Sequence, residues 1–219
     1  MTMHSTREFA AASSTLDYVT AAAQPALFSS VPGQPIPFYP SGAEIYAQGE
    51  EAGNLFQVQF GCVRVYRLLA DGRRQISAFH ISGEVFGFEA GATHRFFAEA
   101  IGGTGVRKIR LTAEVEASPR FLPLALQTMS RAQQHLLVLG RQNAAERLAA
   151  FLVDMAERQG GLDHIDLPMS RGDIGDYLGL TLETVSRIFS KFRQMGIIRL
   201  IDSREVELLK KQALEEMSE

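Results

Sequence analysis

The fold is decided by residues 167–208, LPMSRGDIGDYLGLTLETVSRIFSKFRQMGIIRLIDSREVEL. This stretch holds two short helical patterns with a tight glycine-containing connection between them, followed by two strand-like pieces. Ser170 stands three residues before Asp173, which is typical of a capping box at the start of a helix. Gly179 supplies the backbone freedom that ends the first helix, and Thr181 is a suitable N-cap for the second. Two helices across a short turn and a following hairpin form the winged helix-turn-helix pattern.

The second helix of this pattern has two contrasting faces. Its apolar stripe, which we expect to be buried, consists of Val185, Ile188, Phe189 and Phe192. Glu183, Ser186 and Arg187 lie three and four residues apart and therefore share the opposite face. Arg187 can donate twice to a guanine, and Glu183 can accept from a cytosine amino group, so we expect these three residues to read bases in a major groove. The alternative is an ordinary surface ion pair between Glu183 and Arg187, which their spacing alone would favour.

Cations and hydroxyls around this helix are candidates for contacts with the DNA backbone. Such contacts position a protein on DNA and carry no sequence information. The residues that we expect to make them are Arg171, Thr181, Thr184, Lys191, Arg193 and Arg199.

The composition is that of a soluble globular protein with two small domains. The 219 residues are 46% hydrophobic and 21% charged, with a net charge of −3. No apolar run approaches the roughly 20 residues that span a membrane. Residues 1–28 lack the basic start and apolar centre of a secretory signal, so we interpret them as a mobile leader of a cytoplasmic protein. Cys62 is the only cysteine, which excludes a disulfide framework within the chain.

Residues 29–117 are expected to form a β-roll. Short runs rich in β-branched and aromatic residues alternate there with turn signals, as in a sandwich or a jelly roll. Between two such runs stands Ala70-Asp71-Gly72-Arg73-Arg74, a hairpin signal in which Asp71 and Gly72 are able to take positive φ. The expected fold class is therefore α+β, with an N-terminal β-roll and a C-terminal winged helix-turn-helix.

Residues 118–140 predict a long helix between the two units. Its apolar positions fall at alternating spacings of four and three, as along the seam of a coiled coil. These positions are Leu122, Leu126, Met129, Gln133 and Leu136. The stripe favours a dimerisation helix, and the alternative is a core helix that packs on its own sheet.

The chain closely resembles the CRP/FNR superfamily of bacterial transcription regulators, and the Glu-Thr-Val-Ser-Arg sequence at 183–187 resembles its FNR and FixK branches. The resemblance extends over residues 38–66, FYPSGAEIYAQGEEAGNLFQVQFGCVRVY, and 140–159, GRQNAAERLAAFLVDMAERQ. It implies a cytoplasmic homodimer that reads a palindrome of the type TTGAT-N4-ATCAA, mainly as an activator, in an oxygen-responsive or respiratory and nitrogen-related regulon. In this scheme the long helix at 118–140 is the dimer stalk, and 141–219 form the DNA-binding domain.

The resemblance also implies a contact with RNA polymerase through exposed loops. Our candidate is the hairpin tip at Asp71, Gly72 and Arg73, and a solvated turn without a partner is the alternative. No Ser-His-Asp arrangement, metal-spaced cluster or phosphate loop indicates an enzyme.

The β-roll of this family often holds an effector, and the residues here argue against the known ones. The leader has no cysteine for an iron–sulfur cluster. Aligning residues 83–91 with the cyclic-nucleotide pattern puts Phe88 at the position of the ribose-binding Glu. A cyclic nucleotide stays an alternative ligand, because Glu84, Glu89 and Arg95 lie nearby in the sequence. We therefore expect no cofactor, no metal and DNA binding without an effector.

The alternative is a ligand-gated regulator. Haem would bind through one of three histidines, His80, His94 or His135. A small molecule would bind among five phenylalanines that we otherwise expect to form a core, at positions 79, 86, 88, 96 and 97.

Overall fold

The computed structural model describes residues 35–141 and 143–218. Its order of elements confirms the predicted α+β class: an antiparallel sheet comes first, long helices follow, and a helix-turn-helix with a small sheet comes after them. The predicted leader, 1–28, lies outside the described residues. The exact domain boundaries stay predictions.

The β-roll is built around two long strands. Its strands are β1 (Phe38–Tyr39), β2 (Glu44–Tyr46), β3 (Asn54–Leu68), β4 (Arg74–Ile81), β5 (Val85–Phe86) and β6 (Phe97–Arg110). The order β1-β6-β3-β4 is antiparallel throughout, β2 pairs with β6, and β5 pairs with β3. Aromatic and β-branched residues recur along β3 and β6, which suits a pleated surface with one buried face.

The hairpin between β3 and β4 forms where the sequence predicts it, with one difference in its turn. Gly72 has a φ of +82°, whereas no residue other than glycine has positive φ among the described residues. Asp71 instead accepts hydrogen bonds from the backbone and side chain of Arg73. The expectation of positive φ at Asp71 is therefore wrong, because its carboxylate closes the turn as an Asx-type acceptor.

The inside of the roll is packed with rings. Tyr46 stacks on His94 at a centroid distance of 3.7 Å, and Phe56 stacks on Phe86 at 5.4 Å. His80 also stacks on Phe86, with a centroid distance of 5.0 Å. These side chains are all buried, so aromatic packing occupies the centre of the roll.

The five phenylalanines that were candidates for one pocket lie in separate clusters. Phe86 belongs to the ring cluster inside the roll, and Phe96 packs against that cluster. Phe88 contacts Phe121 of the long helix, Phe97 stacks on Tyr66, and Phe79 faces the helical unit. Strand alternation sends neighbouring side chains to opposite faces, which separates these residues.

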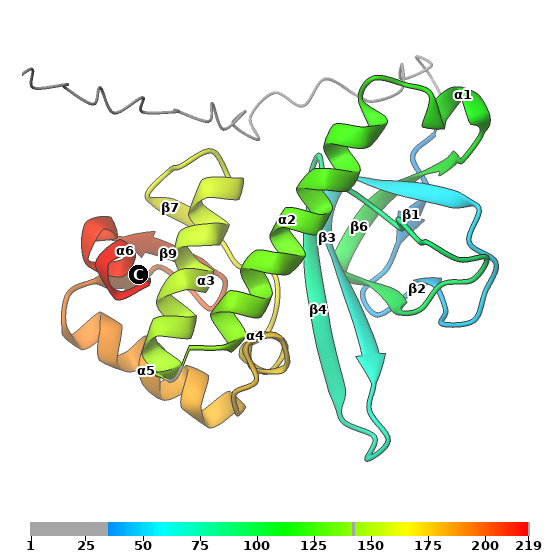
Figure 1. Cartoon of the computed structure of the whole chain (residues 1–219). Helices are drawn as coiled ribbons and strands as arrows, with labels where there is room; N and C mark the ends of the chain where they lie inside the picture. Colours follow the sequence, from blue (N-terminus) through cyan, green and yellow to red (C-terminus); the bar gives the residue numbers. More distant parts are fainter. Residues whose placement is uncertain (1–34, 142, 219) are drawn as a thin grey trace, which may run out of the picture.

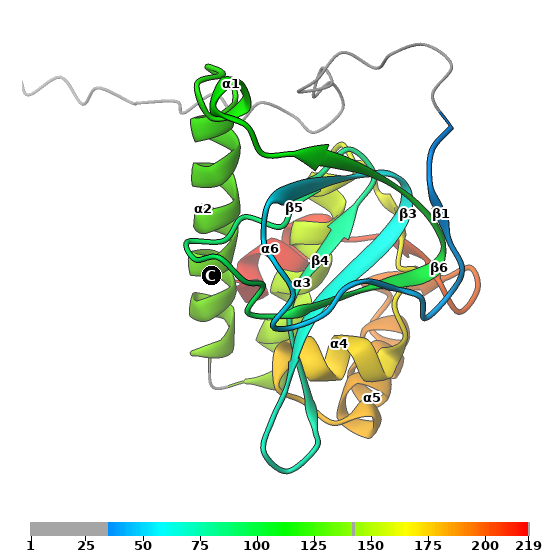
Figure 2. The ribbon, with the colours of Figure 1, turned by 90° about the vertical axis from the view of Figure 1, so that its right-hand side faces the viewer.

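The helices follow the roll. They are α1 (Ala113–Glu116), α2 (Phe121–Leu139) and α3 (Ala144–Arg158). Figure 1 shows α2 passing between the roll and the helical unit, and Figure 2 shows the β3–β4 hairpin extending beside α4 (Arg171–Leu178). No helix of the described ranges has the length and hydrophobicity needed to cross a bilayer.

One apolar core continues from the sheet into the helices. Phe79 of β4 meets Phe151 of α3 edge to face at 6.3 Å, and both rings lie against Tyr177 of α4. Cys62 and Ile76 of the roll belong to the same buried cluster. Burial raises the pKa of the Cys62 thiol to about 12, which is consistent with a buried, unreactive thiol.

A buried carboxylate, Glu84, connects three elements beside this core. It follows β4, and its oxygens accept from Arg158 of α3 at 3.0 and 2.8 Å and from Arg131 of α2 at 2.8 Å. Burial opposes ionisation of Glu84, but Arg158, His80 and Arg131 outweigh it and hold the pKa of Glu84 well below its usual range. Glu84 is therefore charged at neutral pH and ties the roll to both helices.

Replacing Glu84→Gln should destabilise the protein by about 3 kcal/mol at pH 7, because it leaves buried Arg158 without its main counter-charge. The pKa of Glu84 is lower in the folded chain than in the unfolded chain, so its stabilising effect is full above about pH 4.5 and declines as the pH falls below that value. Urea unfolding at pH 7 and pH 4 measures both effects. The control is Glu44→Gln, at an exposed position of β2, and an equal loss of stability in the two variants would contradict the assignment.

Candidate nucleic-acid interface

The first helix of the predicted pair, α4, starts with the expected capping box. The Ser170 hydroxyl accepts from the Asp173 amide at 3.0 Å, and Asp173 Oδ2 accepts from the Ser170 amide at 3.1 Å. Gly179 ends the helix in the left-handed region, with a φ of +65°. Both predictions from residues 170–179 are therefore confirmed, because capping chemistry is local in sequence.

Gly175 lets α4 and the turn approach each other closely. A Cβ atom at this position would lie 2.7 Å from the carbonyl oxygen of Leu180. The amide of Leu180 also donates to the carbonyl of Gly175 at 2.9 Å. The backbone contact that sets the angle between the two helices thus depends on the absence of a side chain here.

The second helix, α5 (Leu182–Gln194), has the predicted cap and the predicted buried stripe. The Thr181 hydroxyl accepts from the Thr184 amide at 3.2 Å. The stripe of Val185, Ile188, Phe189 and Phe192 is buried. This packing fixes the rotation of the helix and leaves its opposite face to solvent.

The three predicted base readers lie on that opposite face. Glu183 and Arg187 are exposed, and Ser186 is half-buried. A hydrogen bond from the Glu183 amide, then the Thr181 hydroxyl and the Arg187 charge, lower the pKa of Glu183, so it is ionised at neutral pH. Arg187 Nη2 lies 3.5 Å from the Thr184 hydroxyl. The described ion pairs do not include one between Glu183 and Arg187, so neither side chain is committed to the other.

The predicted backbone contacts differ in their availability. Lys191, Arg193 and Thr181 are exposed, and Thr184 is half-buried. The Arg171 guanidinium lies over the Phe189 ring at 3.3 Å, and burial lowers its pKa to about 10.

Arg199 lies in the wing. It pairs there with Glu207, across the ladder of β8 (Ile198–Leu200) and β9 (Glu205–Leu208). The sequence predicted this hairpin. It did not predict β7 (His164–Asp166), which pairs with β9 as a third strand of the small sheet, or the helix α6 (Lys211–Ser218).

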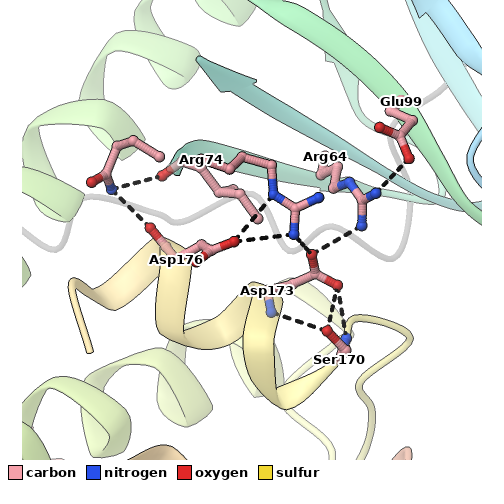
Figure 3. Close-up of polar contacts among 8 residues, drawn as sticks. Arg64, Arg74, Glu99, Ser170, Asp173 and Asp176 are labelled. Carbon is pink, nitrogen blue, oxygen red and sulfur yellow. Dashed lines mark hydrogen bonds and ion pairs between the residues drawn. The ribbon is translucent and has the colours of Figure 1, made fainter. Parts of the chain in front are cut away.

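The other side of α4 contacts the roll. Arg64 of β3 and Arg74 of β4 donate to the carboxylate of Asp173, and Arg74 also donates to Asp176 (Figure 3). Glu99 of β6 pairs with Arg64. Sequence reasoning missed this network, since it joins positions about a hundred residues apart. The sequence offered one signal for it. The short helix α4 carries charged residues directly beside its buried positions, and charges so placed need partners from another element.

Comparisons with known proteins match both units. The family described as "Cyclic nucleotide-binding domain" matches residues 37–112, and that described as "Crp-like helix-turn-helix domain" matches residues 146–217. The "Nitrogen fixation regulation protein FixK" of Rhizobium meliloti (strain 1021) is 56% identical over 176 residues, which cover 80% of this chain and 83% of that protein. The protein of the same name from Azorhizobium caulinodans is 39% identical over 204 residues, covering 88% and 82%.

A solved structure is also similar over most of the chain. FixK2 from Bradyrhizobium japonicum has a TM-score of 0.77 at 41% identity and covers 84% of this chain and 97% of its own. The chain belongs to the CRP/FNR family, in its FixK-like branch. It is a DNA-binding transcription regulator, and its relatives are regulators rather than enzymes.

In this FixK-like regulator, the close approach of α4 to the turn makes Gly175 sensitive to substitution. We expect Gly175→Ala to cost about 1–3 kcal/mol of unfolding free energy, because the added methyl group forces the Leu180 carbonyl away. Chemical denaturation of the full chain measures the change.

The matched control is Gly172→Ala on the same helix. There a Cβ atom has its nearest neighbour at 3.5 Å, so the substitution should be neutral or add up to about 1 kcal/mol. A Gly175→Ala protein as stable as Gly172→Ala would refute the close-approach argument.

Proposed function

We propose that this regulator binds, as a homodimer and without an effector, a palindrome of the type TTGAT-N4-ATCAA. The observation that carries the proposal is the free polar face of α5, where Glu183 and Arg187 project to solvent beside the N-terminus of a well-capped helix. Arg187 donates to a guanine, Glu183 accepts from a cytosine, and Ser186 permits close approach. Lys191, Arg193 and the hydroxyl of Thr181 contact phosphates. The names of two similar relatives, both nitrogen fixation regulation proteins, support a regulon related to nitrogen fixation.

A two-fold site requires two copies of the chain, and α2 supports this. Four apolar side chains of its predicted seam, Leu122, Leu126, Met129 and Leu136, are between 48% and 68% exposed in the single chain. Gln133 is exposed on the same helix. Such a stripe at heptad spacing is covered by a second α2 in a parallel pair.

Binding without an effector is supported by the state of the roll. Glu84 already accepts from Arg158 and Arg131, and Glu89 accepts from the Arg95 amide at 3.0 Å. The two carboxylates that could have bound a cyclic nucleotide are thus already hydrogen-bonded to groups of the protein itself.

The candidate haem ligands are buried, and each of the three imidazole rings stacks on an aromatic ring. His94 stacks on Tyr46, and His135 bonds the Tyr177 carbonyl at 2.8 Å. His80 packs on Phe86 beside Glu84. A ligand would have to displace these contacts.

We also propose that the hairpin tip contacts RNA polymerase. Asp71 and Arg73 are exposed and pair with each other at 2.7 Å around Gly72. The tip therefore presents an ordered pair of opposite charges that does not take part in the packing of the fold.

A gel shift with purified protein on the TTGAT palindrome tests base reading and the absence of an effector together. The wild-type protein should bind without additive, with an affinity that falls as salt rises. Arg187→Ala should lose about 1–3 kcal/mol and its preference at one base pair per half-site. Lys191→Ala is the control and should weaken all sequences alike. Binding only after addition of haem or a cyclic nucleotide would favour the ligand-gated alternative, and unchanged base preference in Arg187→Ala would refute the readout.

Dimerisation through α2 predicts the behaviour of a second variant. Leu126→Glu with Leu136→Glu should convert the protein to a monomer in sedimentation analysis and abolish palindrome binding, because four charges would face each other across the seam. Leu162→Glu is the matched control, since Leu162 is as exposed but lies outside the helix. A double variant that remains dimeric would contradict this interface.

A further inference from the structure

The helix α4 is held by the roll through a compact network of charges (Figure 3). Asp173 Oδ1 accepts from Arg64 Nη1 at 2.9 Å and from Arg74 Nη2 at 2.5 Å. Asp176 Oδ2 accepts from the Nε and Nη2 atoms of Arg74 at 3.1 and 3.0 Å. Arg64 in turn pairs with Glu99. Two cations of one hairpin thus face two anions on consecutive turns of one helix face.

The burial of Asp173 makes this network more than a surface contact. Its side chain is only 5% exposed, and its two oxygens serve different purposes. Oδ2 accepts from the amide and the hydroxyl of Ser170 and caps α4, while Oδ1 accepts only from the roll. A buried carboxylate requires such partners, so the start of α4 is fixed to β3 and β4.

The far end of α4 is also held by side chains from other elements. Its last carbonyls accept from Gln75 of β4 at 2.8 Å, from His135 of α2 at 2.8 Å and from Arg147 of α3 at 3.1 Å. These carbonyls have no partner within a helix, so the surrounding elements satisfy them. The reading face of α5 lies outside all of these contacts and stays open.

We propose that Arg64 and Arg74 are positioning residues for DNA reading, which hold the helix-turn-helix on the roll at the orientation that a palindrome with a fixed spacer requires. This inference rests on the proposed effector-free reading of a palindrome. In a dimer, each recognition helix must meet its own half-site at a set separation. Orientation that is fixed in the free protein removes the need for a ligand to select it.

The strength of the effect follows from populations. The apparent dissociation constant is the intrinsic constant divided by the fraction of molecules in the competent orientation. If loss of one arginine lowers that fraction to about a tenth, binding to the palindrome weakens about tenfold. The penalty for a wrong spacer falls at the same time, because a loosely held helix adapts to other separations. A general loss of stability would weaken binding to all spacers alike.

The test measures binding of the full-length wild-type protein, Arg74→Gln and Asp176→Asn to palindromes with spacers of four and six base pairs. Both variants should bind the four-base-pair site about tenfold more weakly and should discriminate between the spacers less than the wild type does. Arg74→Lys, which keeps the charge, should restore part of the discrimination. Asp176 has no part in the cap of α4, so Asp176→Asn keeps the test valid if Arg74→Gln unfolds.

The matched control is Arg67→Gln, which removes the same charge from an exposed site on β3 and should behave as the wild type. Equal binding and equal spacer discrimination in all proteins would overturn the positioning role, as would tighter binding by Arg74→Gln. A wild-type protein that binds only with added haem or cyclic AMP would overturn the proposed function instead. In that case the wild type and Arg74→Gln are compared on the two spacers in the presence of the additive. Unchanged spacer discrimination in Arg74→Gln would then contradict the positioning role of Arg74.

Discussion

The contact between Phe79 of β4 and Phe151 of α3 joins the two halves of the molecule, and the arrangement of the other elements depends on it. Tyr177 of α4 closes the same aromatic cluster, so strand, linking helix and helix-turn-helix share one buried core. Because packed cores change shape in discrete steps rather than by continuous bending, this shared core sets one orientation of the DNA-binding unit on the roll.

Two groups of ion pairs further restrict the orientation of the DNA-binding unit on the roll. Glu84 binds Arg158 and Arg131 in one group, and Asp173 binds Arg64 and Arg74 in the other. Buried ion pairs add little net stability but are costly to separate, since a lone buried charge remains. They therefore penalise alternative placements of the two units more than they stabilise the fold.

The parts of the interface that the sequence predicted correctly are local ones. The capping box at Ser170, the glycine end at Gly179, the Thr181 cap and the buried stripe of α5 each depend on residues within one or two helical turns. One error is local, the positive φ expected at Asp71, whose carboxylate closes the turn instead. The other differences come from contacts between residues far apart in the sequence. β7 is only three residues long and is defined by pairing with β9, and the five phenylalanines of the roll separate because sheet register decides which face each occupies.

The sequence by itself determined the fold class, the helix-turn-helix with the exposed polar face of α5, and the apolar stripe of α2, because the hydrophobic period and the capping chemistry depend on neighbouring residues. The tertiary structure alone decided that Asp173 caps its helix with one oxygen and holds the roll with the other, and that Glu84 is bound by two arginines. Arginines and carboxylates are common on every protein surface, and spacing along the chain does not indicate which of them will meet. Only the packing of the sheet against α3 and α4 brings these partners within bonding distance and away from water.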